Sequence, residues 1–250
     1  ATSFGGVPYT YQVLKRIGFL QMDLPDLRTM TQAGGKLPIN LHKEFASYAE
    51  KTGKQFVVMY GQTEATARMG YLPAGKAVER CGSMGIAIPG GRFWLEDDKG
   101  EELKEPDTQG ELVYEGENVA LGYACCPEDL KKEDEWKGIL HTGDMAKRDQ
   151  DGYYYITGRK KRFIKMFGNR VNLDETERLL KEHFEGSDFA CVGTDDSVII
   201  FTDLREKSGE ELILEHLYQM TRINSRAAGI HQVDKIPKNL SGKTLYKELL

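Results

Sequence analysis

A helix followed by a short strand, in the first quarter of the chain, constrains the fold more than any other feature of the sequence. Apolar residues recur at helical spacing after Pro38, and Gly53 marks the end of the predicted helix. The apolar run QFVVMY at residues 55–60 then predicts a short buried strand. An earlier loop, from Pro25 to Thr31, leads into another short strand. This strand–loop–helix–strand order predicts the end of a parallel α/β sheet, which we assign to residues 1–80.

The sequence pattern changes after residue 80. Residues 81–160 contain short runs typical of strands, separated by polar turns, and predict a mostly β subdomain. These runs are Arg92–Glu96, Gly110–Tyr114 and Tyr153–Ile156. In residues 161–250, helical and strand patterns alternate over a shorter length and predict a small α+β domain. Its expected elements are strands at Phe163–Phe167, Phe189–Val192, Val198–Thr202 and Ile230–Ile236, and helices at Asp174–Phe184 and Glu210–Ile223. The predicted fold class is therefore mixed α/β and α+β.

Charge and composition exclude several classes of function. The net charge of −5 argues against a nucleic-acid partner, because no basic face is expected to dominate the surface. No apolar run reaches the roughly 18–20 residues that a membrane-spanning helix needs, and no signal peptide precedes Lys15 and Arg16. The four cysteines have no paired spacing, which is typical of free thiols in a reducing compartment, so we predict a cytoplasmic protein. Because residue 1 is alanine, we expect the sequence to be part of a longer polypeptide.

The segment Tyr60–Glu64 (YGQTE) is the strongest local candidate for a ligand site. It directly follows the predicted buried strand, at the edge where open α/β sheets bind ligands. The Thr63 hydroxyl suits a phosphate oxygen, and the Glu64 carboxylate suits Mg²⁺. The alternative is a polar turn that caps the next helix. Five residues alone do not decide between these two interpretations.

Three other apparent motifs fail. Residues 242–244 resemble the end of a P-loop, but Pro237 stands where the first glycine is required. Residues 149–152 resemble part of an EF-hand, yet Lys147 takes the first ligand position. His141 has no nucleophile placed by a recognisable motif, so we interpret it as structural.

Five ordered motifs together resemble the adenylate-forming, or AMP-binding, superfamily. Its members include acyl-CoA synthetases, aryl-CoA ligases, the adenylation domains of peptide synthetases, and luciferase. The resemblance extends from about Gly34 to Lys243. The motifs are Tyr60–Glu64, Gly110–Val113, Thr142–Asp144, Gly158–Lys161 and Ser241–Lys243.

The resemblance implies a site for ATP and AMP with Mg²⁺. It places Gly34 and Gly35 at the adenine and acyl pocket, and Tyr60, Gly61 and Gln62 in the nucleotide site. Thr63 would contact the α-phosphate, and Glu64 would bind Mg²⁺. Asp144 would lie at the ribose, and Arg159 at the ribose or phosphate. A carboxylate such as Asp144 suits ribose hydroxyls, because it offers two acceptor oxygens.

The resemblance also implies that the C-terminal domain is mobile. Lys161 lies where the family has its hinge, and Lys243 where it has a mobile catalytic lysine. A lysine ammonium neutralises the charge that builds when a carboxylate attacks the α-phosphate. Gly168 would line the entry path of the coenzyme A thiol. The structural alternatives are a turn role for Asp144, a solvated linker at residues 159–162, and an exposed loop at Lys243.

The implied function is that of an ATP-dependent acid:thiol ligase. Such an enzyme joins a carboxylic acid to AMP and then passes the acyl group to coenzyme A. The alternatives are an adenylation domain that loads the phosphopantetheine of a carrier protein, and a non-catalytic nucleotide-binding module. The presence of Glu64, Asp144 and Lys243 together argues against the non-catalytic module. The sequence does not identify the acid.

We predict that the isolated 250 residues do not catalyse ATP–pyrophosphate exchange. Residues 1–54 contain no Gly-, Ser- and Thr-rich phosphate loop of the kind the family carries before the strand at Gln55. The β- and γ-phosphates would therefore lack their main contacts. Exchange by the isolated chain at the rate of a longer parent protein would contradict this prediction.

Overall fold

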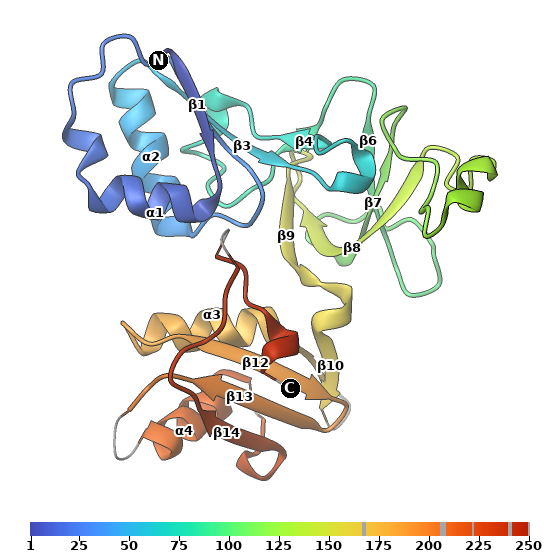
Figure 1. Ribbon diagram of the computed structural model, residues 1–250. Coiled ribbons are helices and arrows are strands. Elements are labelled where there is room, and N and C mark those ends of the chain that lie inside the picture. The colour runs from blue at the N-terminus through green and yellow to red at the C-terminus, as the bar shows by residue number, and fades with distance from the viewer. Residues whose placement is uncertain (167–168, 206–208, 222, 240–241, 250) are drawn as a thin grey trace. The chain divides into compact units, whose positions relative to one another are not determined.

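The computed structural model describes residues 1–166, 169–205, 209–221, 223–239 and 242–249. The chain divides into two compact units, Ala1–Thr157 and Gly158–Leu250, and each is described by itself (Figure 1). The further division of the first unit at residue 80 stays a prediction from the sequence.

The first unit opens with a sheet whose first three strands are parallel. The strand order is β1–β2–β3–β4–β5, and the last two strands pair antiparallel. The elements are β1 (Ser3–Gly6), α1 (Pro8–Arg16), β2 (Thr29–Gln32), α2 (Ile39–Lys51), β3 (Gln55–Tyr60), β4 (Gly70–Tyr71) and β5 (Ile86–Ala87). Buried aromatic rings join the helices to the sheet: Tyr11 of α1 packs edge-on against Phe45 of α2 at 4.9 Å and against Phe56 of β3 at 5.5 Å. Burying rings of this size is a major source of stability.

The second part of this unit is an antiparallel sheet of four strands in the order β6–β7–β8–β9. The strands are β6 (Arg92–Glu96), β7 (Gln109–Glu115), β8 (Ile139–Arg148) and β9 (Tyr154–Arg159). Gly85 and Tyr154 form a bridge that joins this sheet to the end of the first one. Gly85 is required there: its φ is +90°, and an added Cβ would lie 1.8 Å from the Tyr71 carbonyl oxygen.

The second unit is a small α+β domain. Its elements are β10 (Phe163–Met166), β11 (Asn169–Asn172), α3 (Leu173–His183), β12 (Phe189–Thr194), β13 (Ser197–Thr202), α4 (Gly209–Thr221) and β14 (Ala228–Gln232). Strands β10 and β11 form a hairpin, and β12–β13–β14 form a second sheet. Asn172 begins α3 by accepting hydrogen bonds from the backbone N–H groups of Asp174 and Glu175.

The two faces of the β12–β13–β14 sheet are covered by different parts of the chain. Successive side chains of a strand point to opposite faces. Phe189 and Cys191 belong to the buried cluster that contains Leu180 of α3 and Leu217 of α4. On the other face, the C-terminal segment covers the sheet. The residues of this second cluster include Ala190, Phe201, Ile236, Tyr246 and Leu249.

The architecture confirms the predicted fold class, and most predicted elements in the second unit lie within two residues of those observed. The strand expected at Ile230–Ile236 instead covers Ala228–Gln232, because the chain then turns to the other face of the sheet, where Ile236 is buried. Helix α1, the ten-residue strand β8 and the short strands β1, β4, β5 and β11 had no predicted counterpart. Within the described residues, no helix combines the length and apolar character needed to cross a membrane.

His42 is a buried polar group of α2 that holds the segment between β4 and β5. The residue is only 1% exposed. Its Nε2 lies 2.9 Å from the Ala77 carbonyl oxygen, and its Nδ1 accepts a hydrogen bond from the Gly82 backbone N–H at 3.2 Å. A carbonyl only accepts and an N–H only donates, so both contacts require the neutral ring with hydrogen on Nε2. Burial lowers the pKa of His42, and the hydrogen bond to Ala77 opposes this effect.

We predict that the first unit loses stability as the pH falls below about 6.5, the ordinary pKa of histidine. In that range the unfolded chain binds a proton at His42 that the folded chain excludes, so the free energy of unfolding decreases with falling pH. Urea unfolding from pH 8 to 5.5 measures this slope, and fluorescence reports the first unit because Trp94 and Trp136 both lie there.

Substitution of His42 gives the matched test. His42→Gln should flatten the pH slope, whereas His141→Gln, at an exposed ring in the same unit, should preserve it. An unchanged slope in His42→Gln would contradict the assignment.

Candidate functional site

An irregularity in strand β8 determines where the Asp144 carboxylate points. β7 and β8 pair at Glu111 with Met145 and again at Val113 with His141. Between these pairs β7 has the single residue Leu112, while β8 has residues 142–144. The extra residues form a bulge, and Gly143 adopts a φ of +67° that favours glycine. Such bulges redirect side chains at functional sites.

The bulge is held by hydrogen bonds from its own residues. The Thr142 hydroxyl donates to the Leu112 carbonyl oxygen at 2.7 Å and accepts from the Asp144 backbone N–H at 3.1 Å. The Gly143 N–H donates to the Glu111 carboxylate at 3.3 Å. These contacts compensate the backbone groups that the interrupted ladder leaves without a strand partner. The motif Thr142–Asp144 therefore lies inside a strand, and a simple turn role for Asp144 is wrong.

The Asp144 carboxylate contacts the segment that follows β3. Its Oδ2 atom accepts a hydrogen bond from the Tyr60 hydroxyl at 2.6 Å and from the Gln62 amide at 3.0 Å. The same Gln62 amide donates to the Thr142 carbonyl oxygen at 2.9 Å. Residues separated by more than 80 positions in the sequence thus form one polar cluster at the carboxyl edge of β3. This is the edge where open α/β sheets bind ligands.

A tight loop displays Thr63 and Glu64 beside this cluster. An added Cβ at Gly61 would lie 2.4 Å from the Ala67 carbonyl oxygen. The Ala67 N–H closes the loop by donating to the Gln62 carbonyl oxygen at 2.9 Å. Ala67 itself has a φ of +63°, a conformation that non-glycine residues rarely adopt. The loop therefore depends on a glycine at position 61, and within it Thr63 is exposed.

Glu64 is positioned by a segment that sequence reasoning did not connect to it. Its Oε1 atom accepts a hydrogen bond from the Tyr123 hydroxyl at 2.7 Å, and its carbonyl oxygen accepts from the Ala120 N–H at 2.8 Å. The Tyr123 ring packs edge-on against Trp136 at 5.0 Å. The hydrogen bond to Glu64 raises the pKa of the Tyr123 hydroxyl. A contact across 59 residues has no local signal in the sequence.

Gly34 and Gly35 lie just beyond the carboxyl end of β2. Strands β2 and β3 are parallel neighbours, with Gln32 paired to Val58, so their carboxyl ends share one edge of the sheet. The buried Gln32 amide donates to the Gly35 carbonyl oxygen at 2.8 Å and holds the glycine loop. Both glycines are exposed, and Gly34 has a φ of +82°.

The other predicted site residues belong to the second unit. Arg159 and Lys161 are exposed, and the Arg159 backbone N–H donates to the Asp174 carboxylate at 3.2 Å. Lys243 is exposed in the C-terminal segment. Gly168 lies outside the described residues, as does Ser241 of the last motif.

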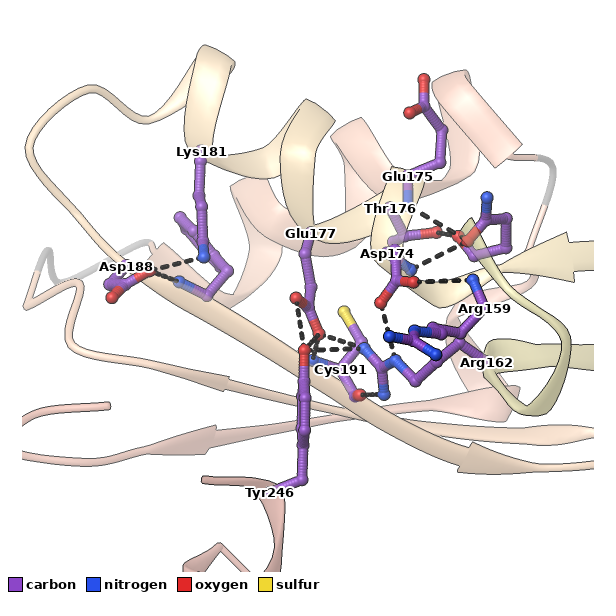
Figure 2. A network of polar contacts seen from close by, with 12 residues as sticks. Arg159, Arg162, Asp174, Glu175, Thr176, Glu177, Lys181, Asp188, Cys191 and Tyr246 are labelled. Atoms are coloured by element: carbon purple, nitrogen blue, oxygen red, sulfur yellow. Dashed lines mark hydrogen bonds and ion pairs between the residues drawn. The ribbon is translucent and has the colours of Figure 1, made fainter. Parts of the chain in front are cut away.

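The structural alternative for residues 159–162, a solvated linker, does not hold at its last residue. The Arg162 side chain is only 16% exposed, and its guanidinium donates to the Asp174 carboxylate at 2.7 Å and pairs with the buried Glu177 (Figure 2). Lys160 and Lys161 are exposed, as expected of a charged linker. Arg162 therefore belongs to the interior of the second unit.

The residues of the first unit fit a nucleotide with Mg²⁺ better than a metal ion alone. No group of three or more His, Cys, Asp or Glu side chains in the described part of the chain forms a metal site. Mg²⁺ is commonly held by one or two carboxylates together with substrate phosphates, which suits Glu64. Asp144 is 4% exposed, and its Oδ2 atom accepts the two hydrogen bonds from Tyr60 and Gln62.

Comparison with known proteins agrees with this geometry. The family model described as AMP-binding enzyme matches residues 1–124. The 4-hydroxybutyrate–CoA ligase 1 of Metallosphaera sedula is 31% identical over 266 aligned residues, which include 99% of this chain and 45% of that enzyme. The chain belongs to the AMP-binding enzyme family. It spans about half the length of the curated relatives it matches.

Solved structures of adenylate-forming enzymes have the same fold. The o-succinylbenzoate CoA synthetase from Bacillus subtilis, in complex with its acyl-adenylate intermediate, matches with a TM-score of 0.77 at 21% identity, covering 100% of this chain and 51% of that one. The anthranilate CoA ligase in complex with anthranoyl-AMP matches with a TM-score of 0.70 at 26% identity, covering 99% and 48%.

We predict that Gly61→Ala destabilises the first unit by about 1–3 kcal/mol, because the new methyl group meets backbone atoms that no side-chain rotation can move. Gly75→Ala is the matched control, since an added Cβ there has nothing within 4 Å. Urea unfolding followed by tryptophan fluorescence compares the two variants. Equal unfolding free energies would show that the Gly61 loop tolerates a side chain.

Proposed function

We propose that the full-length gene product is an AMP-forming acid:thiol ligase. The observation that carries the proposal is the junction of Asp144 with Tyr60 and Gln62 at the carboxyl edge of β3. This junction gathers two of the family-like motifs into one cluster of acceptors and donors suited to a nucleoside. The names of the relatives support the choice of reaction, since those compared are CoA ligases or CoA synthetases.

The reaction has two steps. An oxygen of the substrate carboxylate forms a bond to the α-phosphorus of ATP, and the bond to pyrophosphate breaks. The sulfur of coenzyme A then attacks the acyl carbon, and AMP leaves with the electron pair of the broken C–O bond. The first step accumulates negative charge around the α-phosphate, so fixed positive groups there lower its barrier.

The residues of the first unit bind and orient the nucleotide in this proposal. Asp144 accepts hydrogen bonds from the ribose hydroxyls, and Thr63 contacts the α-phosphate. Gly34 and Gly35 border the pocket of the adenine and the acyl group. Glu64 holds Mg²⁺, which when bound neutralises phosphate charge. The o-succinylbenzoate enzyme solved with ATP and magnesium ion supports this pairing of ligands.

The second unit supplies mobile groups. Lys243 brings its ammonium to the α-phosphate during adenylation, Lys161 lies at the hinge, and Arg159 contacts the ribose or phosphate. Gly168 would border the path of the thiol. A lysine delivered on a separate unit leaves the site once the adenylate has formed, which opens the site to coenzyme A. We place this activity in the cytoplasm, where ATP and coenzyme A are available.

We predict that Lys243→Ala in the full-length protein lowers ATP–pyrophosphate exchange by roughly 10²-fold or more, because a positive charge is lost from the transition state. AMP binding, measured by calorimetry, should persist, since the first unit holds the nucleoside. Lys247→Ala is the control, because this exposed lysine lies in the same segment. Unchanged exchange in Lys243→Ala would refute the proposed role.

A further inference from the structure

A buried ion pair in the second unit reaches the segment that carries Lys243. The Arg162 guanidinium pairs with the Glu177 carboxylate, and Glu177 is 6% exposed. The Tyr246 hydroxyl donates to the same carboxylate, 2.9 Å from Oε2 (Figure 2). The Cys191 backbone N–H adds a third donor at 2.7 Å. Burial raises the pKa of Glu177, and the charge of Arg162 opposes this effect. The carboxylate therefore depends on these donors for its solvation.

Arg162 fixes the Tyr246 ring as well as its hydroxyl. The guanidinium carbon lies 4.1 Å from the centre of the ring, a cation–π contact. An Arg162 N–H also donates to the Tyr246 hydroxyl oxygen at 3.1 Å. The ring packs with Ala190 and Phe201 on the face of the sheet opposite the helices. Hydrogen bonds, stacking and packing together hold the Tyr246 side chain in this conformation.

Tyr246 lies three residues after Lys243, at one end of a compact turn. The Leu245 N–H donates to the Pro237 carbonyl oxygen at 2.9 Å, which closes the turn. Inside it, the Lys243 N–H donates to the Asn239 side-chain oxygen at 2.9 Å. Lys238 and Thr244 form a bridge across the turn. The Lys243 backbone is thus hydrogen-bonded to Asn239 through both its groups, since the Asn239 N–H also donates to the Lys243 carbonyl oxygen at 2.9 Å.

Both arms of this turn are attached to acidic residues of the same unit. On one arm Lys238 pairs with Asp188, which also binds Lys181 at 2.7 Å. On the other arm Tyr246 binds Glu177. Glu177 and Lys181 both belong to α3, so a single helix supports both attachments. This arrangement is more than packing requires, because a phenylalanine would fill the place of the Tyr246 ring.

We propose that Tyr246 is a positioning residue for Lys243, acting through its hydroxyl bond to the Arg162–Glu177 pair. The inference rests on the proposed function, in which Lys243 acts at the α-phosphate. Catalysis by a charged group requires its placement to within a fraction of an ångström. The buried network supplies that accuracy to a lysine that is itself exposed.

A double-mutant cycle in the full-length protein tests the proposal. Tyr246→Phe keeps the ring and removes the hydroxyl, and should lower the kcat of ATP–pyrophosphate exchange about tenfold with little change in the KM for ATP. In the Lys243→Ala background the same change should have no further effect, since the two residues act as one unit. Tyr218→Phe, on α4 of the same unit, is the matched control and should leave exchange unchanged.

Two further readouts separate positioning from general support of the fold. Thioester formation from supplied acyl-adenylate and coenzyme A should be unaffected by Tyr246→Phe, because Lys243 has already left the site. In the isolated chain, hydrogen exchange at residues 242–245 should quicken in Tyr246→Phe and in Glu177→Gln, but not in Tyr218→Phe.

The outcomes distinguish this inference from the proposed function. Equal losses in both half-reactions, a full Tyr246→Phe effect in the Lys243→Ala background, or unchanged exchange in Tyr246→Phe would each overturn the positioning role. A Lys243→Ala variant with normal exchange would instead overturn the proposed function. The rate of hydrogen exchange at residues 242–245 measures how firmly the turn is held, whether or not Lys243 acts in catalysis.

Discussion

The hydrogen bonds from Tyr60 and Gln62 to Asp144 are the contacts on which the candidate site depends. They join the end of a parallel sheet to the middle of an antiparallel one. They bring the buried carboxylate on β8 together with the loop after β3. A hydrogen bond to a charged group contributes about 1.5–3 kcal/mol when its partners are fixed. Here both partners are fixed by local structure: the bulge on β8 and the tight loop at Gly61.

The two units position their candidate functional side chains in different ways. In the first, backbone geometry does most of the positioning, through positive φ angles and a glycine that approaches another backbone closely. In the second, a buried charge pair organises the neighbouring side chains around Glu177. Breaking such a pair leaves an uncompensated charge in the interior. The backbone geometry of the first unit and the buried ion pair of the second each fix side chains that lie far apart in the sequence.

Much of the fold follows from periodicity and turn chemistry. The buried strand β3 and the helix before it were predictable because apolar spacing and Gly53 agreed with each other. Strand β8 was not, because Gly143 interrupts the alternation that identifies a strand. Helix α1 was also missed, although Pro8 marks its beginning; only Tyr11 in it is buried.

The site residues divide in the same way. The motif segments found from the sequence include Tyr60, Gln62 and Asp144, which contact one another, because the order of these segments along the chain carries the family pattern. Tyr123 and Tyr246 were not found, since a tyrosine hydroxyl gives no sign of its acceptor until the chain is folded. The inward position of Arg162 was not predicted, because a run of basic residues usually stays in solvent and only tertiary structure shows one of them turned inward.

The C-terminal segment has two roles, and removing residues from this end of the chain would affect both. It carries Lys243, and it also covers the face of the β12–β13–β14 sheet that the helices leave bare, through Ile236, Tyr246 and Leu249. Shortening the chain from this end would expose Ala190 and Phe201 to water while removing the lysine. Truncated forms would then aggregate or unfold as well as lose the lysine that we propose to act in adenylation. The segment is therefore constrained twice, once by the proposed reaction and once by the need to shield a face of the sheet from water.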